Sequence, residues 1–292
     1  MLTKRFIVIF LILNCSIMVS AQFRNASAWS YSAYLGFSNL IGDISGKNVN
    51  SLPYYEELNP ALSRPIFGIG IQRHFDRIGV GAYISGSQFV VDDSYSIYSS
   101  RINRNITVHT DMLEAKVSLE LTPFAKTRIP LLKHWYINGG FGAIVFQPKA
   151  RYKNEWVNLQ PLGTEGQNYL NNRKPYSRVA MIIPVNVGYM LKLRNGNRMK
   201  FDFGFRKTFT DYLDDVSTTY ANPQAIAASS GELAAYFADP SFTGKPEGSA
   251  RGSSSSKDLY MTAGIQLEFS FSRKSANCNQ FGAPGGESSW RR

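Results

Sequence analysis

The stretch DMLEAKVSLEL, at positions 111–121, alternates between apolar and polar side chains almost without interruption. From position 113 every second residue is apolar, and the residues between them are Glu114, Lys116, Ser118 and Glu120. Successive side chains of a strand point to opposite faces, whereas a helix would mix the two sets. The stretch therefore predicts a β-strand with one apolar face and one charged face.

The same alternation recurs in other parts of the chain, at 29–38, 67–72, 78–85, 135–145, 179–191, 199–206 and 258–271. With 111–121 this makes eight segments, each about as long as a tilted strand needs to cross a bilayer. Their regular recurrence along the chain favours a fold built almost entirely from β-strands.

The connections between these segments alternate in length. Short connections follow the even-numbered segments, at 75–77, 123–134 and 194–198, and long ones follow the odd-numbered segments, at 40–63, 90–106, 148–177 and 211–257. Short periplasmic turns and long outer loops are typical of outer-membrane barrels, with both termini in the periplasm. We therefore predict an all-β fold: an eight-stranded antiparallel transmembrane β-barrel in the bacterial outer membrane.

A soluble β-sandwich is the main alternative, because its strands alternate in the same way. The chain contains 19 Phe and 16 Tyr, and beyond the N-terminus no apolar run approaches the ~18 residues of a membrane helix. The polar faces of the segments carry opposite charges, which suit a lumen closed by ion pairs better than a solvent-exposed sheet. Together with the loop lengths, these features favour the barrel.

The N-terminus has the pattern of an export signal. Lys4 and Arg5 precede an apolar stretch at 6–19, and Val-Ser-Ala at 19–21 resembles a cleavage site. We expect a signal peptide at 1–21, the outer-membrane barrel at 22–272 and a flexible periplasmic tail at 273–292, which is rich in Gly, Ser and Pro. A lipid-attached start at Cys15 is the less favoured alternative, because Asn14 precedes it where a small residue is usual.

The net charge of +11 is typical of proteins that bind nucleic acid or anionic headgroups. The basic residues are spread along the chain, however, and export argues against nucleic acid as a partner. After signal cleavage only Cys278 remains, so no intramolecular disulfide is expected. Outer-membrane lipids are the partners that this composition favours.

Eight strands enclose an interior that side chains just fill, so we do not expect a wide diffusion pore. The inward faces bring together a set of charges that we call the lumen charge network: Glu114, Lys116, Glu120, Lys192, Lys200, Asp202, Arg206 and Glu268. Buried charges are costly unless they are paired. We therefore expect these side chains to neutralise one another.

Asp211, Asp214 and Asp215 lie where the seventh segment ends and the longest loop begins. Clustered carboxylates suit a divalent cation such as calcium or magnesium. The alternative is a hydrogen-bonded turn at the barrel rim, with Arg206 and Lys207 as counter-charges. Adjacent strand residues point to opposite faces, so a single site is not assured and the rim turn is favoured.

The histidines His74, His109 and His134 fit no metal spacing and no Ser-His-Asp grouping. We assign no catalytic, cofactor-binding or metal residue, and expect neither an enzyme nor a small-molecule substrate. A lipid-modifying enzyme is the alternative.

The short connection at 123–134 carries three basic residues, Lys126, Arg128 and Lys133. They are our candidate partner-binding residues, because their charge suits an acidic protein face. The alternative is that they are simply solvated.

Two loop segments resemble the shared segments of PorG-like proteins: LQPLGTEGQ at 159–167 and FRKTFTDYLDDVSTTY at 205–220. These proteins are small outer-membrane barrels of Bacteroidetes that are associated with the type IX secretion system. Three shorter pieces agree, namely SNLIGDI at 38–44, FQPKARY at 146–152 and ARGSSSSKDLYMTAGI at 250–265. The resemblance covers nearly the whole mature chain in order, except for the tail after position 273.

The resemblance implies a non-enzymatic component of the type IX protein secretion and gliding machinery. It also implies association with a periplasmic ring of PorK/GldK-type lipoprotein and PorN/GldN, without a role as the translocation pore. The family supplies no catalytic residues, and its shared aspartates imply a structural loop feature. A stand-alone outer-membrane structural or ligand-binding barrel is the alternative function.

Overall fold

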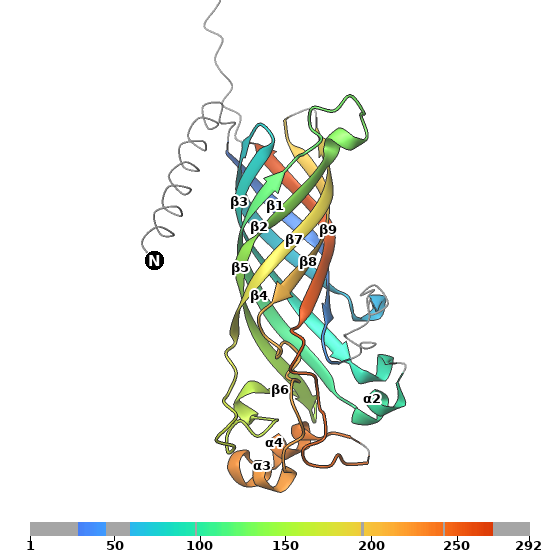
Figure 1. The fold of residues 1–292 in the computed structure, drawn as a ribbon, viewed down its shortest axis with the longest axis vertical. Helices are drawn as coiled ribbons and strands as arrows, with labels where there is room; N and C mark the ends of the chain where they lie inside the picture. Colours follow the sequence, from blue (N-terminus) through green and yellow to red (C-terminus); the bar gives the residue numbers. More distant parts are fainter. Residues whose placement is uncertain (1–28, 45–58, 97, 194–195, 242, 271–292) are drawn as a thin grey trace, which may run out of the picture.

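The computed structural model describes residues 29–44, 59–96, 98–193, 196–241 and 243–270. Eight long antiparallel strands form the barrel wall: β1 Trp29–Ile41, β2 Arg64–Phe75, β3 Ile78–Asp92, β4 Thr107–Leu121, β5 Trp135–Tyr152, β7 Val179–Lys192, β8 Arg198–Thr208 and β9 Leu259–Ser270. Each strand pairs with its neighbours in sequence, and β1 pairs with β9 to close the barrel (Figure 1). The expected signal peptide and C-terminal tail lie outside the described residues.

The direction in which the apolar faces of the strands point distinguishes a barrel from a β-sandwich. On β4, Leu113 and Val117 are 53% and 58% exposed, whereas Glu114 and Glu120 are 0% and 2% exposed. A sandwich would bury its apolar faces between two sheets. Here the apolar side chains face outward and the charged ones face inward, so the predicted eight-stranded barrel is confirmed.

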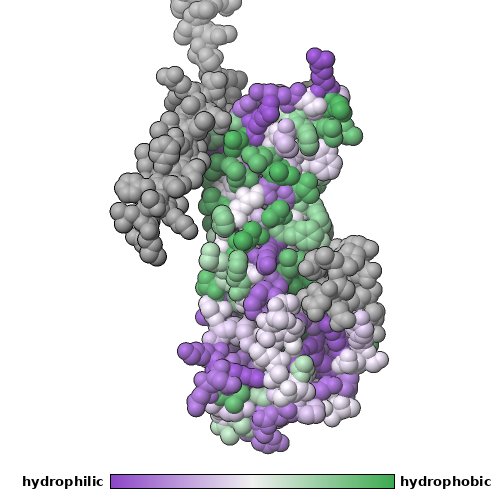
Figure 2. Space-filling model, in the orientation of Figure 1, coloured by the Kyte–Doolittle hydropathy of each residue, from purple (hydrophilic) through white to green (hydrophobic). Residues whose placement is uncertain are grey.

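Hydrophobic residues gather over the strands, and the end that carries α3 and α4 is mostly hydrophilic (Figure 2). An outward apolar band around a closed barrel, with aromatic residues such as Trp29 and Trp135 exposed on it, is typical of outer-membrane proteins. The chain is an outer-membrane β-barrel. Within the described residues, the helices are too short or too polar to cross a bilayer.

The long connections meet at one end of the barrel and the short ones at the other, as the sequence predicts (Figure 1). We call these the loop end and the turn end. The connections contain short helical elements: η3 Pro60–Leu62, η4 Asp93–Tyr95, α2 Ser99–Arg104, η5 Leu132–His134, η6 Gln160–Leu162, α3 Pro223–Ser230 and α4 Glu232–Ala238. Gly231, with a φ of 90°, separates α3 from α4.

Several strands are longer at the loop end than the sequence indicates. β5 continues to Tyr152 and turns back into the short strand β6, Glu155–Asn158. The turn residues Lys153 and Asn154 both have positive φ, 45° and 72°, which is the backbone of a tight hairpin. The hairpin lengthens the wall where the loops fold over it.

Tyrosine rings fill the barrel interior where glycines leave space. Tyr83 lies opposite Gly70 in the β2–β3 register, and a Cβ atom at Gly70 would lie 2.2 Å from its ring. The interior cavity beside Lys116 and Asp202 has a volume of only about 30 Å³. That is room for one water molecule, so side chains fill the interior here.

Candidate functional site

The charged interior near the turn end is built around Glu268. Its carboxylate accepts hydrogen bonds from Ser30 Oγ at 2.5 Å, His74 Nε2 at 2.6 Å and Arg198 Nη1 at 2.8 Å. Lys200 Nζ lies 3.0 Å from its second oxygen. These partners come from β1, β2 and β8, so one carboxylate on β9 joins four adjacent strands of the wall.

Lys200 is fully buried and bridges two carboxylates. Its Nζ lies 2.6 Å from Glu120 Oε2 as well as 3.0 Å from Glu268 Oε2. Gln72 donates to Glu120 at 3.1 Å and accepts from Lys200 at 3.1 Å. The polar groups are therefore satisfied mainly by one another.

A second layer lies closer to the loop end. Glu114 accepts a hydrogen bond from Tyr260 OH at 2.5 Å and lies 3.1 Å from Lys116 Nζ and 3.5 Å from Arg206 Nε. Asp202 accepts from Tyr136 OH at 2.8 Å. In both layers carboxylates meet cations or hydroxyl donors from strands that are not neighbours in the wall, as Glu120 of β4 meets Lys200 of β8.

The structure brings seven of the eight predicted lumen residues into these layers, and Lys192 is the exception. Lys192 has the inward parity of its strand but is its last residue, and it is exposed at the turn end. The sequence analysis missed His74 and Arg198, which also join the network. Continuing the alternation to the ends of β2 and β8 would have found both.

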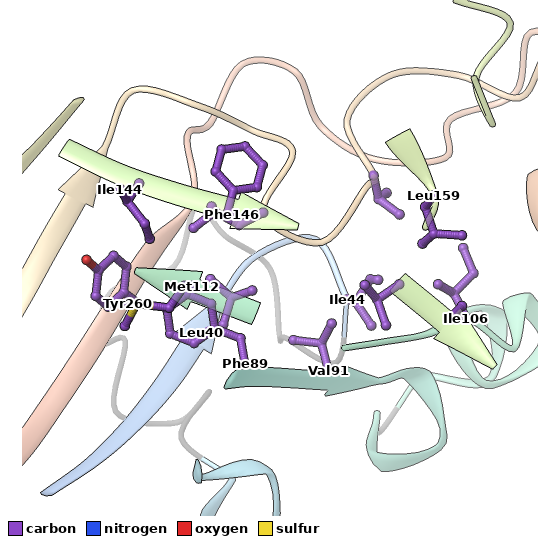
Figure 3. Packing of buried hydrophobic residues seen from close by; sticks show 14 of the residues in the cluster. Leu40, Ile44, Phe89, Val91, Ile106, Met112, Ile144, Phe146, Leu159 and Tyr260 are labelled. Atoms are coloured by element: carbon purple, nitrogen blue, oxygen red, sulfur yellow. The ribbon is translucent and has the colours of Figure 1, made fainter. Parts of the chain in front are cut away.

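An apolar cluster closes the barrel at the loop end. Phe89, Met112, Ile144, Phe146 and Tyr260 point toward one another from several strands (Figure 3). Leu213 and Val216, from the loop after β8, are fully buried in the same cluster. The loop thus folds back into the barrel mouth and acts as a plug.

The predicted aspartate motif holds this plug in place. Asp214 Oδ2 accepts hydrogen bonds from the backbone N–H groups of Asp43 at 3.0 Å and Ile44 at 3.2 Å. Asp211 Oδ2 accepts from Ser217 Oγ at 2.6 Å, and Asp215 Oδ2 accepts from Thr164 Oγ1 at 2.6 Å. The three carboxylates therefore serve three different loop contacts.

Four further residues complete what we call the cap, which consists of the motif together with Asp43, Glu165, Arg251 and Asp258. Glu165 accepts hydrogen bonds from the backbone N–H groups of Ser217 at 2.9 Å and Thr218 at 3.1 Å. Arg251 Nη1 lies 3.2 Å from Glu165 Oε1 and donates to the Asp215 carbonyl at 2.6 Å. Arg251, which lies in the connection between β8 and β9, is therefore the cap's main cation.

The prediction that Arg206 and Lys207 are the counter-charges of the aspartates is wrong. Arg206 points inward to Glu114, and Lys207 is exposed on the next position of β8. Strand alternation sends these neighbours to opposite faces, so neither reaches the cap.

Burial raises the pKa values of the cap carboxylates. The pKa of Asp211 rises to about 7, and that of Asp215 rises to about 6 although Arg251 opposes the shift. The pKa values of Asp214 and Asp258 rise well above their usual range, through burial and then through nearby carboxylates. The cap therefore takes up protons near neutral pH.

The described residues contain no group of three or more His, Cys, Asp or Glu side chains arranged to hold a metal ion. The carboxylates of the aspartate motif accept hydrogen bonds within a turn, in which Asp215 has a φ of 62°. The motif lies inside the mouth, with its carboxylates buried, rather than on an open rim.

The candidate partner residues lie on the β4–β5 connection at the turn end. Lys126 Nζ lies 3.4 Å from Asp76 Oδ2, with both side chains mostly exposed. Arg128 and Lys133 are also exposed, and Lys133 lines a cavity of about 310 Å³ beside His74 and Glu120. The same connection exposes three large apolar side chains: Phe124, Ile129 and Leu131.

The three histidines lie in separate places. His74 belongs to the charged interior, His109 packs edge-on against Trp156, and His134 packs against Tyr189. The structure does not bring them together as a site.

No family model matches this chain, and no curated protein matches it. Three solved structures resemble it over most of its length. Neisserial surface protein A has 6% identity and a TM-score of 0.39, with 85% of this chain and 100% of that chain covered. Ail, the attachment invasion locus protein of Yersinia pestis, has 11% identity and a TM-score of 0.36, with 83% and 99% covered. The outer membrane protein OprG of Pseudomonas aeruginosa has 9% identity and a TM-score of 0.33, with 84% and 97% covered.

Proposed function

We propose that the protein is a non-enzymatic outer-membrane barrel that works through its two ends, as a structural or ligand-binding component, and does not act as a channel. The observation that carries this proposal is the filled interior. Paired charges occupy the turn-end half, and the loop that bears Leu213 and Val216 closes the other half. A barrel of this size then offers its loops and turns, rather than its lumen, to other molecules.

Conductance measurements test this proposal. The full-length protein, reconstituted in a planar lipid bilayer, should give no regular conductance steps above those of lipid alone, whereas a general porin added under the same conditions should give them. Reproducible single-channel steps from the purified protein would contradict it.

A more specific function is a component of the type IX protein secretion and gliding machinery. The support is the placement of the segments that resemble PorG-like proteins. Asp43, Glu165 and Asp214 come from three of these segments, and the cap joins them by hydrogen bonds. Arg251, from a fourth segment, reaches Glu165. The segments that resemble PorG-like proteins thus meet in one structural unit, the cap.

In this function the turn end faces the periplasm and contacts a ring of PorK/GldK-type lipoprotein and PorN/GldN. Lys126, Arg128 and Lys133 supply positive charge there, and Phe124, Ile129 and Leu131 supply exposed apolar surface. Basic and apolar side chains on one short connection suit an acidic partner with an apolar centre.

Deletion and capture experiments distinguish the two functions. Deletion of the protein should abolish cargo secretion, and the tagged protein should co-purify with the ring from detergent-solubilised outer membranes. The triple variant K126E/R128E/K133E should lower ring capture, while K174E, an exposed charge reversal at the loop end, should not. Normal secretion after deletion would leave the stand-alone barrel as the function.

A further inference from the structure

A cavity of about 520 Å³ lies at the loop end, between α2 and the segment at 245–253. Arg101, Arg104, Lys245 and Arg251 line it, and Asp43 is the one carboxylate among its described lining residues. The cavity is distinct from the partner surface proposed above, which lies at the opposite end of the barrel. Its lining has an excess of positive charge.

Two of these cations form ion pairs with carboxylates that do not line the cavity. Arg104 donates from Nε and Nη2 to Asp93 at 2.8 Å and 2.7 Å, and Arg251 is held by Glu165 at 3.2 Å. The Lys245 ammonium, in contrast, forms no ion pair with the described part of the chain. The positive charge of Lys245 is therefore not compensated locally.

The cavity also has buried donors that lack a partner. Tyr220 is 3% exposed, and its hydroxyl makes no hydrogen bond with the described residues. Arg251 is also 3% exposed, and its Nε has no acceptor there. Buried polar atoms are nearly always satisfied, so each such atom calls for an explanation. Both residues line the cavity, and an acceptor bound there would satisfy donors that the protein leaves unpaired.

We propose that this cavity binds an oxyanion, namely a phosphate or sulfate group, either free or carried on a larger polar molecule. Arginine guanidinium groups, a lysine ammonium and a tyrosine hydroxyl are the donors that such groups require. The volume exceeds that of a single oxyanion and falls within the usual range for small-molecule sites.

Titration calorimetry of the full-length protein in detergent, in a phosphate-free buffer, tests the proposal. The probes are inorganic phosphate, inorganic sulfate and glucose 6-phosphate, with glucose as the uncharged control. We expect saturable binding of at least one anion that weakens as the salt concentration rises, and no binding of glucose. Tighter binding of glucose 6-phosphate than of phosphate assigns the site to a carried group, and equal binding assigns it to the free ion.

Two variants and a matched control make the test specific to this cavity. K245Q should weaken anion binding about tenfold, and Y220F, which removes only the hydroxyl, should weaken it about fivefold. K174Q, which changes an exposed lysine at the loop end outside the cavity, should bind like wild type. Unchanged heat-modifiable migration on gels verifies that each variant is folded. The proposal is overturned if no anion binds wild type saturably, or if both cavity variants bind like wild type.

Discussion

The charged interior and the cap both bury carboxylates, but they satisfy them in opposite ways. In the interior, Glu120 of β4 and Glu268 of β9 both form ion pairs with Lys200 of β8. In the cap, Asp211 and Asp214 receive hydrogen bonds from hydroxyls and backbone N–H groups instead of a cation of their own.

This difference predicts that the charged interior is insensitive to solution conditions, whereas the stability of the cap depends on pH. Charges in the interior are paired, and breaking one pair leaves the other charge buried without its partner. Carboxylates with raised pKa values change charge near neutral pH, so the solution can alter the strength of the cap. The two ends of one barrel should therefore respond differently to mutation and to pH.

The largest effect should come from breaking the interior. Replacing Lys200 by Met leaves Glu120 and Glu268 buried with less positive charge, and should lower the free energy of unfolding by about 3–5 kcal/mol. Urea titration of the protein folded in detergent measures it. Lys192→Met, at the exposed end of β7, is the control and should cost within about 0.5 kcal/mol. Equal stability of the two variants would mean that the interior is not held by these pairs.

Breaking the cap should have a smaller and more local effect. Arg251→Met removes the cation beside Glu165 and should destabilise the closed cap by about 3 kcal/mol while the strands stay folded. Limited proteolysis should then cut the connection between β8 and β9 faster than in wild type. Arg151→Met, at an exposed arginine of the same end, should leave the cutting rate unchanged. Loss of the whole barrel instead of the cap would contradict the separation of the two regions.

The pH dependence should distinguish the regions without a mutation. The pKa values of Asp211 and Asp215, about 7 and about 6, lie above the ordinary aspartate value of about 4. Groups with raised folded-state pKa values stabilise the fold below the unfolded pKa and lose this contribution as pH rises through the folded pKa. The cap should therefore be tightest near pH 4 and looser by pH 8, as measured by proteolysis or amide exchange.

Asp211→Asn serves as the control for this pH effect, because it removes one titrating group and keeps an acceptor for Ser217. In this variant the protection of the cap should change less with pH around 7, the pKa of Asp211 in the wild type. A wild-type cap that becomes more protected from pH 5 to pH 8 would refute the assigned direction.

The smallest effect should come from the exposed turn. The triple variant K126E/R128E/K133E should change the free energy of unfolding by no more than about 0.5 kcal/mol, since all three side chains are exposed. The same urea titration measures it. A large loss of stability would mean that these residues are part of the barrel structure rather than of a docking surface.

The wall of the barrel could be predicted from the sequence because its signal is local. Leu113 and Glu114 are neighbours, and their opposite faces follow from strand geometry alone. The position of a charge along the strand was harder to predict, as Lys192 shows, because parity gives the face of a side chain but not its depth in the barrel.

The cap could not be derived in the same way. Asp43, Glu165 and Arg251 lie far apart in the sequence, and their contacts depend on how three long connections fold over one mouth. Nearness in the sequence led to Arg206 and Lys207 as partners of the aspartates, whereas the real partner is Arg251. The segments that resemble PorG-like proteins contain these residues but give no information about which of them are in contact.

The pairing of β1 with β9 also has a consequence for biogenesis. Ser30 of β1 lies opposite Ser270 of β9. The barrel therefore cannot close until the last strand of the chain is present to pair with the first. Until then two rows of backbone N–H and C=O groups have no partner, which hydrocarbon does not tolerate. The polypeptide must therefore be carried across the envelope whole and kept from aggregating on the way, and a nascent chain cut short before β9 should be degraded rather than inserted.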